Sequence, residues 1–296
     1  MSPETESVYH SASRKACLEH FLVLQAMGVD SDVLSVEGEF AVVVSAQDVE
    51  QAKTQLRLYH QENQAWGAAA VASRPHNPYG WNGVFLSATI LFLVDFLQQA
   101  HVFSLDWWEA GKANSGLIRQ GEWWRCVTAL SLHVDLAHLI GNLIFGGLFG
   151  LLASRQVGGG LAWLAILLAG ALGNGVNAFL QAARHTAVGA STAVFGALGI
   201  LAAVAWSTHR RFDRRWLIRW TPAIAGVVLL SLLGTGGERT DVTAHLAGFV
   251  AGGLAGVGVG WLHQWFKMAS WLQWLLGLTA LVIVIQSWVM ALQAHG

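Results

Sequence analysis

Long apolar segments dominate this sequence from about Val84 onward, and they constrain its fold more than any other feature. The hydrocarbon core of a bilayer is about 30 Å thick, and a helix needs about 20 apolar residues to cross it. Inside lipid, every backbone N–H and C=O must be hydrogen-bonded within the chain, so such segments form helices. The candidate spans are 83–100, 133–153, 159–181, 191–208, 217–235, 243–265 and 269–292. The sequence therefore predicts an all-α polytopic membrane protein.

The overall composition agrees with this fold class. Hydrophobic residues make up 54% of the chain and charged residues only 12%, against about 25% charged residues in ordinary soluble domains. The net charge is -1, so nothing in the charge balance favours a protein that binds nucleic acid. Cys17 and Cys126 lie in different segments, so they predict neither a disulfide framework nor a zinc knuckle.

The first 80 residues predict a small α+β domain that is followed by a linker. The expected elements are a helix over 12–27, strands over 31–36 and 40–44, and a helix from 46 to about 64 that is capped by Ser45. Pro75, Pro78 and Gly80 mark the linker. We therefore expect three parts: residues 1–80, a six-helix membrane domain over 81–265, and one additional C-terminal membrane helix over 266–296.

Positive charges predict the orientation of the spans. The loop between the fourth and fifth spans carries five arginines, and loops rich in Lys and Arg stay in the cytoplasm. These residues are Arg210, Arg211, Arg214, Arg215 and Arg219. Counting the spans in both directions places the N-terminal domain in the cytoplasm and the C-terminus outside.

Three polar motifs interrupt the apolar spans, where polar residues are costly and mark functional sites. They read His133-Val-Asp-Leu-Ala-His138-Leu-Ile-Gly-Asn142, Gly189-Ala-Ser191-Thr-Ala-Val-Phe195-Gly196 and Asp241-Val-Thr-Ala-His245-Leu-Ala-Gly248. Spans two, four and six run in the same direction, and each motif lies near the start of its span. The motifs should therefore lie at one depth in the bilayer, as parts of one site.

The residue types in these motifs suit acyl transfer. A serine hydroxyl is a weak nucleophile that needs an adjacent base, and His245 can take the proton of Ser191 and return it to the leaving amine. The oxyanion needs preset donors. His138 and Asn142 share a helix face, and the backbone N–H of Ser191 adds a third donor at a helix N-terminus. Gly189 leaves the approach to the serine uncrowded.

Neighbouring residues predict how this pair is held. Asp241 is expected at the water boundary and Asp135 near His138, so we favour a Ser–His dyad over a triad. Phe195 lies one turn after Ser191 and could pack on the His245 ring. A strip of glycines at four-residue spacing, which lets another helix approach closely, could bring His245 onto the span of Ser191. The strip consists of Gly248, Gly252, Gly256 and Gly260.

Two other functions stay open at this point. His133, His138 and His245 could form a tri-imidazole zinc site. The first two are five residues apart, however, and diverge by about 140° on a straight helix, and no His-Glu-x-x-His motif is present. A transporter could instead use the intramembrane histidines as a proton relay, although no inverted repeat is visible.

From about Trp123 to Gly260 the sequence resembles the rhomboid family of intramembrane serine proteases. The matching elements are Trp124-Arg125 in the first loop, His138-x-x-x-Asn142, Gly189-x-Ser191, the aromatic Phe195 and His245-x-x-Gly248. The residue after the serine is Thr192, where the family has glycine. The additional C-terminal span is similar to the six-plus-one arrangement of some bacterial members.

The resemblance implies a function and a location. It implies a dyad of Ser191 and His245, an oxyanion hole built from the Ser191 amide with His138 and Asn142, and no cofactor or metal. Substrates would be single-pass or polytopic membrane proteins in the lipid bilayer, cleaved near the outer face. The expected location is the bacterial inner membrane. The remaining alternative within this resemblance is an inactive relative that binds membrane clients without cutting them.

Overall fold

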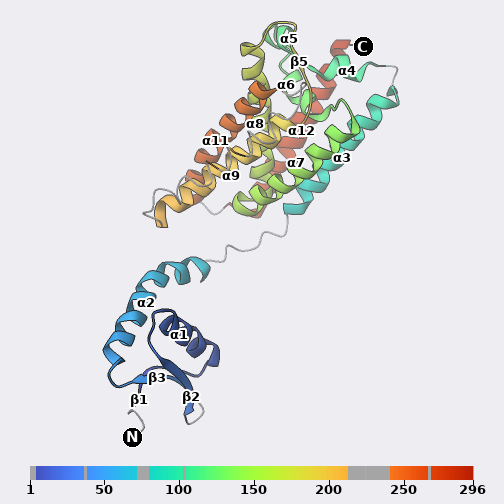
Figure 1. Ribbon diagram of the computed structural model, residues 1–296. Coiled ribbons are helices and arrows are strands. Elements are labelled where there is room, and N and C mark those ends of the chain that lie inside the picture. The colour runs from blue at the N-terminus through green and yellow to red at the C-terminus, as the bar shows by residue number, and fades with distance from the viewer. Residues whose placement is uncertain are drawn as a thin grey trace. The chain divides into compact units, whose positions relative to one another are not determined.

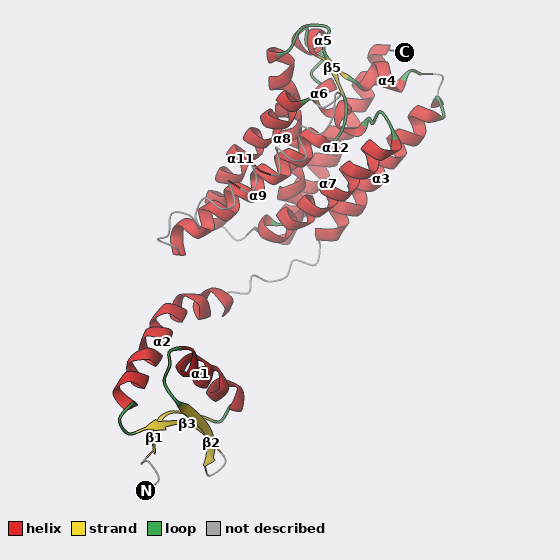
Figure 2. Ribbon diagram, in the orientation of Figure 1, coloured by secondary structure: helices red, strands yellow, loops and turns green. Residues whose placement is uncertain are grey.

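The computed structural model describes residues 5–36, 39–71, 80–102, 105–212, 224, 228, 241–265 and 268–295 (Figure 1). The chain divides into two compact units, Met1–Pro75 and His76–Gly296. We call them the N-terminal unit and the membrane unit. They differ in secondary structure, because the N-terminal unit contains a three-stranded sheet, whereas the described part of the membrane unit is built mainly from long helices (Figure 2).

The N-terminal unit is an α+β fold in which two helices pack on an antiparallel sheet of strand order β1-β3-β2. Its core is a cluster of Val, Leu, Ala and Cys side chains from both helices and from β3, including Cys17, Leu24 and Val42, each 0% exposed. The elements are β1 (Thr5–Ser11), α1 (Arg14–Ala26), β2 (Ser31–Val36), β3 (Glu39–Ser45) and α2 (Val49–Val71).

Three details of this unit differ from the sequence prediction. The second helix, α2, runs to Val71 and does not end at about residue 64. The unit also contains β1, which was not predicted and whose register with β3 runs from Thr5 opposite Ser45 to Ser11 opposite Phe40. The prediction also places Ser45 at the cap of the second helix, which in fact begins at Val49. The Ser45 carbonyl accepts the backbone N–H of Asp48 at 2.8 Å, so a turn separates β3 from α2.

The membrane unit confirms the predicted helical membrane fold. Five helices are long and apolar enough to cross a bilayer, and the fourth predicted span contributes the shorter apolar stretch Ser191–Ser207. The predicted fifth span, 217–235, lies outside the described residues except for 224 and 228. The long helices are α3 (Gly80–Gln99), α7 (Leu136–Val157), α8 (Gly159–Leu180), α9 (Ser191–Phe212), α11 (Val242–Trp265) and α12 (Ser270–His295).

The segment between α3 and α7 folds into short elements rather than an open loop. Its two-residue strand β4 pairs with β5, which lies in the loop between α8 and α9. This pairing joins the first loop of the membrane unit to the loop that leads into α9, the helix that begins at Ser191. The short elements are α4 (Trp107–Gly111), β4 (Ala113–Asn114), α5 (Ser115–Arg119), α6 (Arg125–Thr128), the 3₁₀ turn η2 (Ala129–Ser131) and β5 (Thr186–Ala187).

The glycine strip of α11 lies directly on the backbone of α9, as the sequence predicts. A Cβ atom added at each of three glycines would collide with a carbonyl oxygen of α9. The distances would be 2.2 Å from Gly248 to Thr192 O, 2.0 Å from Gly252 to Gly196 O and 2.8 Å from Gly256 to Ile200 O. Small residues thus allow two helix backbones to touch, which is how helices associate in lipid.

The structure does not test the predicted orientation of the spans. Of the arginines that predict it, Arg214, Arg215 and Arg219 lie outside the described residues, and only the backbones of Arg210 and Arg211 are described, in α9. The cytoplasmic placement of the N-terminal unit therefore stays a prediction.

Candidate active site

Ser191 and His245 meet in the membrane unit. Ser191 Oγ lies 2.8 Å from His245 Nε2, a hydrogen bond between the first residue of α9 and the fourth residue of α11. His245 is 7% exposed. When Nε2 carries no proton, it accepts the serine hydroxyl, which is the arrangement that nucleophilic catalysis requires.

The backbone before Ser191 fixes where the hydroxyl lies. Gly189 has φ = +124°, a conformation that side-chain-bearing residues rarely adopt. Its N–H donates to Ala129 O at 2.9 Å, and the Ala190 carbonyl accepts the first helical N–H, from Val194. Because Ser191 begins the helix, no helical carbonyl accepts its own N–H, which stays available for a ligand.

His245 is held from its own helix and from α9. The Phe195 ring lies 4.6 Å from the His245 ring, measured between centroids, at an interplanar angle of 38°. One turn earlier, Asp241 caps α11 by accepting the Ala244 N–H at 3.0 Å. The predicted contact of Phe195 with the histidine is confirmed.

Asp241 also joins two other elements to the start of α11. Its Oδ2 accepts His185 Nε2 at 2.7 Å and Asn177 Nδ2 at 2.6 Å. His185 lies in the loop before α9, and Asn177 in α8. The carboxylate therefore anchors the N-terminus of the helix that carries His245.

His138 lies beside the serine, and Asn142 adjoins it. A Cβ added at Gly189 would be 2.6 Å from His138 Cε1 and 3.6 Å from Ser191 Oγ, so the histidine ring occupies the space next to the nucleophile. Asn142 is 7% exposed, and its Nδ2 donates to His138 O at 3.1 Å. This bond uses one N–H of the amide, and a second N–H is available.

His133 lies closer to His138 than the sequence analysis expects. The expected divergence assumed one straight helix, but α7 begins at Leu136 after its cap Asp135. The two histidine rings are T-shaped with centroids 5.1 Å apart. His133 Nε2 accepts the Ala190 N–H at 3.5 Å, a contact that sequence reasoning missed.

Arg125 of the predicted Trp-Arg pair is an anchor of the first loop. Its side chain is 0% exposed, and its guanidinium bonds four groups. Trp124 packs partly buried in the cluster of Trp107, Leu132 and Trp288. The partners of Arg125 are Glu122 Oε2 at 2.5 Å, the carbonyls of Glu109 and Lys112 at 2.8 and 2.9 Å, and His295 Nε2 at 2.9 Å.

Thr192 fits next to the nucleophile because two glycines face it. Thr192 is 3% exposed. A Cβ at Gly173 would lie 2.6 Å from Thr192 Cγ2, and one at Gly248 would lie 2.9 Å from the same atom. Helices α8, α9 and α11 thus meet at Thr192. Thr192 directly follows Ser191, and Gly248 follows His245 by three positions, so the contact between Thr192 and Gly248 keeps α9 and α11 in register.

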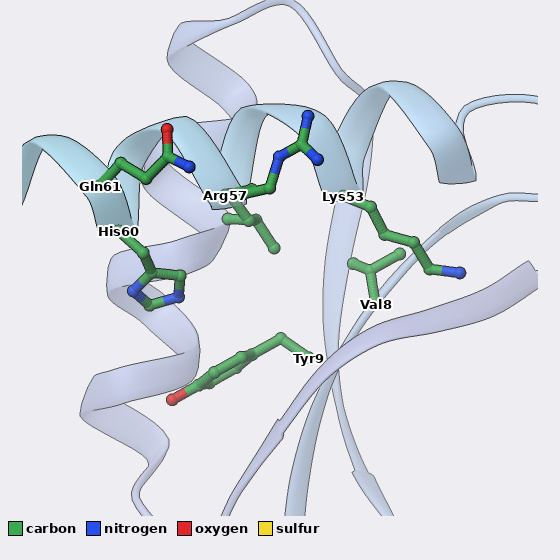
Figure 3. A pocket seen from close by; sticks show the side chains of 7 residues that line it. Val8, Tyr9, Lys53, Arg57, His60 and Gln61 are labelled. Carbon is green, nitrogen blue, oxygen red and sulfur yellow. The ribbon is translucent and has the colours of Figure 1, made fainter.

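A hollow lies in the N-terminal unit. It has a volume of about 390 Å³, and its walls come from β1 and α2 (Figure 3). It holds no serine or cysteine beside a base, so it does not suit acyl transfer. The lining residues are Val8, Tyr9, Lys53, Leu56, Arg57, His60 and Gln61. In the described part of the chain, no three His, Cys, Asp or Glu side chains are grouped to hold a metal ion.

Residues 120–263 match the Rhomboid domain. The chain is 33% identical over 150 residues to the Rhomboid protease GluP of Bacillus subtilis, which covers 51% of this chain and 29% of that protein. It is 31% identical over 149 residues to the Rhomboid-like protease 2 of Toxoplasma gondii, covering 50% of each chain. It is 32% identical over 160 residues to the chloroplastic Rhomboid-like protein 11 of Arabidopsis thaliana, covering 50% of this chain and 55% of that protein. The chain thus spans between about a third and about half of the length of these relatives.

Proposed function

Because the chain belongs to the rhomboid family and crosses the membrane several times, we propose that it is an intramembrane serine endopeptidase that cleaves transmembrane helices of other proteins. The observation that carries the proposal is the 2.8 Å contact between Ser191 Oγ and His245 Nε2. Two relatives that are named proteases support it.

The proposed reaction runs through an acyl-enzyme. Ser191 Oγ attacks the scissile carbonyl carbon while its proton passes to His245 Nε2. The imidazolium then gives that proton to the leaving amine as the C–N bond breaks. A water molecule next attacks the ester and gives its proton to His245, and the serine leaves with that proton. The reaction needs no metal or cofactor.

Three donors are proposed to stabilise the oxyanion. The Ser191 N–H points out of the start of α9, where the helix dipole also favours negative charge. His138 lies against Gly189, next to the serine, and Asn142 keeps one amide hydrogen free of its bond to His138 O. Losing one such donor typically costs about 10²–10³ in rate.

The proposal also covers the roles of the three parts of the chain, the place of cleavage and the substrates. Residues 81–265 would form the catalytic membrane domain, 1–80 a cytoplasmic domain with its linker, and 266–296 an additional membrane helix that ends outside. Cleavage would take place near the outer face of a bacterial inner membrane. Substrates would be single-pass or polytopic membrane proteins, and we propose no nucleic-acid partner.

The proposal is tested with purified protein in liposomes that contain a fluorophore-labelled transmembrane substrate. Wild type should release product, and Ser191→Ala and His245→Ala should not. Ser207→Ala is the matched control, because this serine lies in the same helix and its Oγ bonds Val204 O at 2.8 Å. A fluorophosphonate should label Ser191 and fail to do so after His245→Ala.

Three outcomes would contradict the proposal. Cleavage that survives Ser191→Ala would remove this residue from the mechanism. A wild-type protein that binds the substrate without cutting it would be a client-binding relative. Transport of a solute without fluorophosphonate labelling would instead favour the proton-relay alternative.

A further inference from the structure

The last helix, α12, contacts the membrane unit next to the candidate active site. Its Trp288 is 7% exposed, and the Trp288 ring lies 5.1 Å from the Trp107 ring of α4, measured between centroids. A Cβ at Gly111 would lie 2.4 Å from Trp288 Cη2, so the indole fills the space that this glycine leaves open. Figure 2 shows α4, α6 and the C-terminal end of α12 close together.

The indole N–H bonds a short buried segment that comprises residues 128–133, which we call the strap. Trp288 Nε1 donates to Ser131 Oγ at 3.0 Å, and Ser131 Oγ donates to Thr128 O at 2.8 Å. Ser131 is 4% exposed and Thr128 is 0% exposed. Consecutive hydrogen bonds in a buried site reinforce one another, and breaking one leaves a polar group unpaired. Trp288 therefore fixes the conformation of the strap.

The strap in turn holds the two residues that precede the nucleophile. Ala129 O accepts the Gly189 N–H at 2.9 Å, and His133 Nε2 accepts the Ala190 N–H at 3.5 Å. The His133 ring also contacts His138. A displacement of the strap would thus move both the approach to Ser191 and one proposed oxyanion donor.

A second contact ties α12 to the same region. His295 Nε2, at the end of α12, lies 2.9 Å from Arg125 Nη2, and Arg125 begins the short helix that runs into the strap. Two contacts from one helix thus reach the strap and the residues before it. The bond from Trp288 to Ser131 is buried and the bond between His295 and Arg125 is partly buried, so both add polar contacts to the apolar packing of α12.

From these contacts we infer that Trp288 is a positioning residue of the proposed protease, acting through Ser131 and the strap on Gly189, Ala190 and the His138 ring. The inference rests on the proposed function. According to this inference, α12 supports the geometry of the proposed active site and does not serve only as a membrane anchor. Trp288 does not touch the reacting atoms, so its loss should affect the transition state more than substrate binding.

The test compares Trp288→Phe, Ser131→Ala and the double variant in the liposome assay. Trp288→Phe keeps an aromatic ring and removes the N–H donor, while Ser131→Ala removes the acceptor. Each single change should lower kcat about 10- to 100-fold, the range of a small misplacement near a reacting group. KM should stay within about 2-fold, because the lost interaction acts in the transition state. The double variant should lose no more than the worse single variant, because Ser131→Ala already removes the bond from Trp288, together with the Ser131 bond to Thr128 O.

Trp271→Phe serves as the matched control, since Trp271 lies in the same helix and is 68% exposed. It should leave kcat unchanged. Thermal unfolding midpoints of all variants are measured alongside, so that a loss of folded protein is separated from a loss of turnover.

The outcomes separate this inference from the proposed function. Wild-type cleavage that disappears in Ser191→Ala upholds the protease; unchanged kcat in Trp288→Phe and Ser131→Ala then overturns the positioning role alone. Losses that multiply in the double variant, or that follow the unfolding midpoint, also overturn it. Absence of wild-type cleavage overturns both.

Discussion

The N-terminal unit and the membrane unit differ in how their elements make their closest contacts. In the N-terminal unit, apolar side chains such as Leu24 and Val42 are 0% exposed and form the core between the helices and the sheet. The membrane unit also buries large side chains, such as Ile200 at 1% exposed, but many others face outward, such as Leu254 at 71% exposed. Its contact between α9 and α11 is made by glycines, such as Gly252 against the backbone of α9.

The difference follows from the solvent around each unit. Water drives large apolar side chains into a core, at about 25 cal/mol per Å² of apolar surface buried. Lipid tails are as apolar as leucine, so helices in a bilayer associate through close packing and polar contacts. In the membrane unit, the same glycines that allow close packing also set the distance between Ser191 and His245. Stability and the geometry of the candidate site therefore depend on the same contact.

The largest effect is expected where the glycine strip is filled. Gly252→Leu should abolish cleavage, because a Cβ alone would lie 2.0 Å from Gly196 O and α11 must move away from α9. Even a displacement of about 1 Å can cost about 10² in rate. The measurement is product release in liposomes. Gly253→Ala is the control, since a Cβ there meets nothing within 4 Å, and it should keep activity. An active Gly252→Leu protein would show that the strip does not set the site.

A smaller loss of cleavage is expected when the buried Asn142 amide, a proposed oxyanion donor, is removed. Asn142→Ala should lower kcat about 10²–10³-fold, as for other oxyanion donors, with little change in unfolding midpoint. Asn174→Ala is the contrasting change, because Asn174 Nδ2 donates to Cys126 O at 2.9 Å and not to a residue of the proposed site. It should lower stability by about 1–3 kcal/mol and keep the kcat of the folded fraction. Equal kcat in Asn142→Ala and wild type would make Asn142 a packing residue.

In the N-terminal unit, the effect on catalysis should be smaller still. Leu24→Ala should destabilise that unit by about 2–5 kcal/mol, as for other fully buried leucines, and leave kcat within about 2-fold. Leu22→Ala, at a position 63% exposed in the same helix, should change neither. Cleavage rates are compared with urea unfolding followed by far-UV circular dichroism. A parallel loss of cleavage in Leu24→Ala would show that the two units are coupled.

The smallest expected difference concerns the two thiols, one in each unit. Burial raises the pKa of Cys17, and it raises the pKa of Cys126 to about 11, so both thiols stay protonated and alkylate slowly at pH 8. Urea should expose Cys17 at a lower concentration than Cys126. The reason is that urea weakens the hydrophobic effect, which forms the core around Cys17 in the N-terminal unit. Mass spectrometry of the alkylated peptides measures this order. Simultaneous labelling would indicate one cooperative unit.

The sequence predicted the long membrane helices well, because their signal lies in local composition. Six of the seven expected spans coincide with described helices to within a few residues, and the seventh, 217–235, is not described. In the N-terminal unit the sequence missed β1. The stretch Thr5–Ser11 is mostly polar, and its strand conformation comes from pairing with β3, which is a tertiary contact.

The site was predictable where the motif residues lie on regular helices. The glycine spacing of α11 and the position of Phe195 predicted that His245 would reach α9. The strap was not predictable, because Ser131 and Trp288 are 157 residues apart and neither lies in a motif. His133 was misjudged for a related reason: the sequence does not reveal that Asp135 begins a new helix. The catalytic roles themselves stay predictions.

Ser191 and His245 are 54 positions apart in the chain, and this separation has a consequence for the synthesis of the protein. A ribosome that adds about 5–20 residues per second needs roughly 3–11 s to pass from the serine to the histidine. During that interval the nascent chain carries a nucleophile without its base. In the proposed enzyme, proteolytic competence is acquired only when α11 has entered the bilayer and docked, so unfinished chains are harmless to their neighbours.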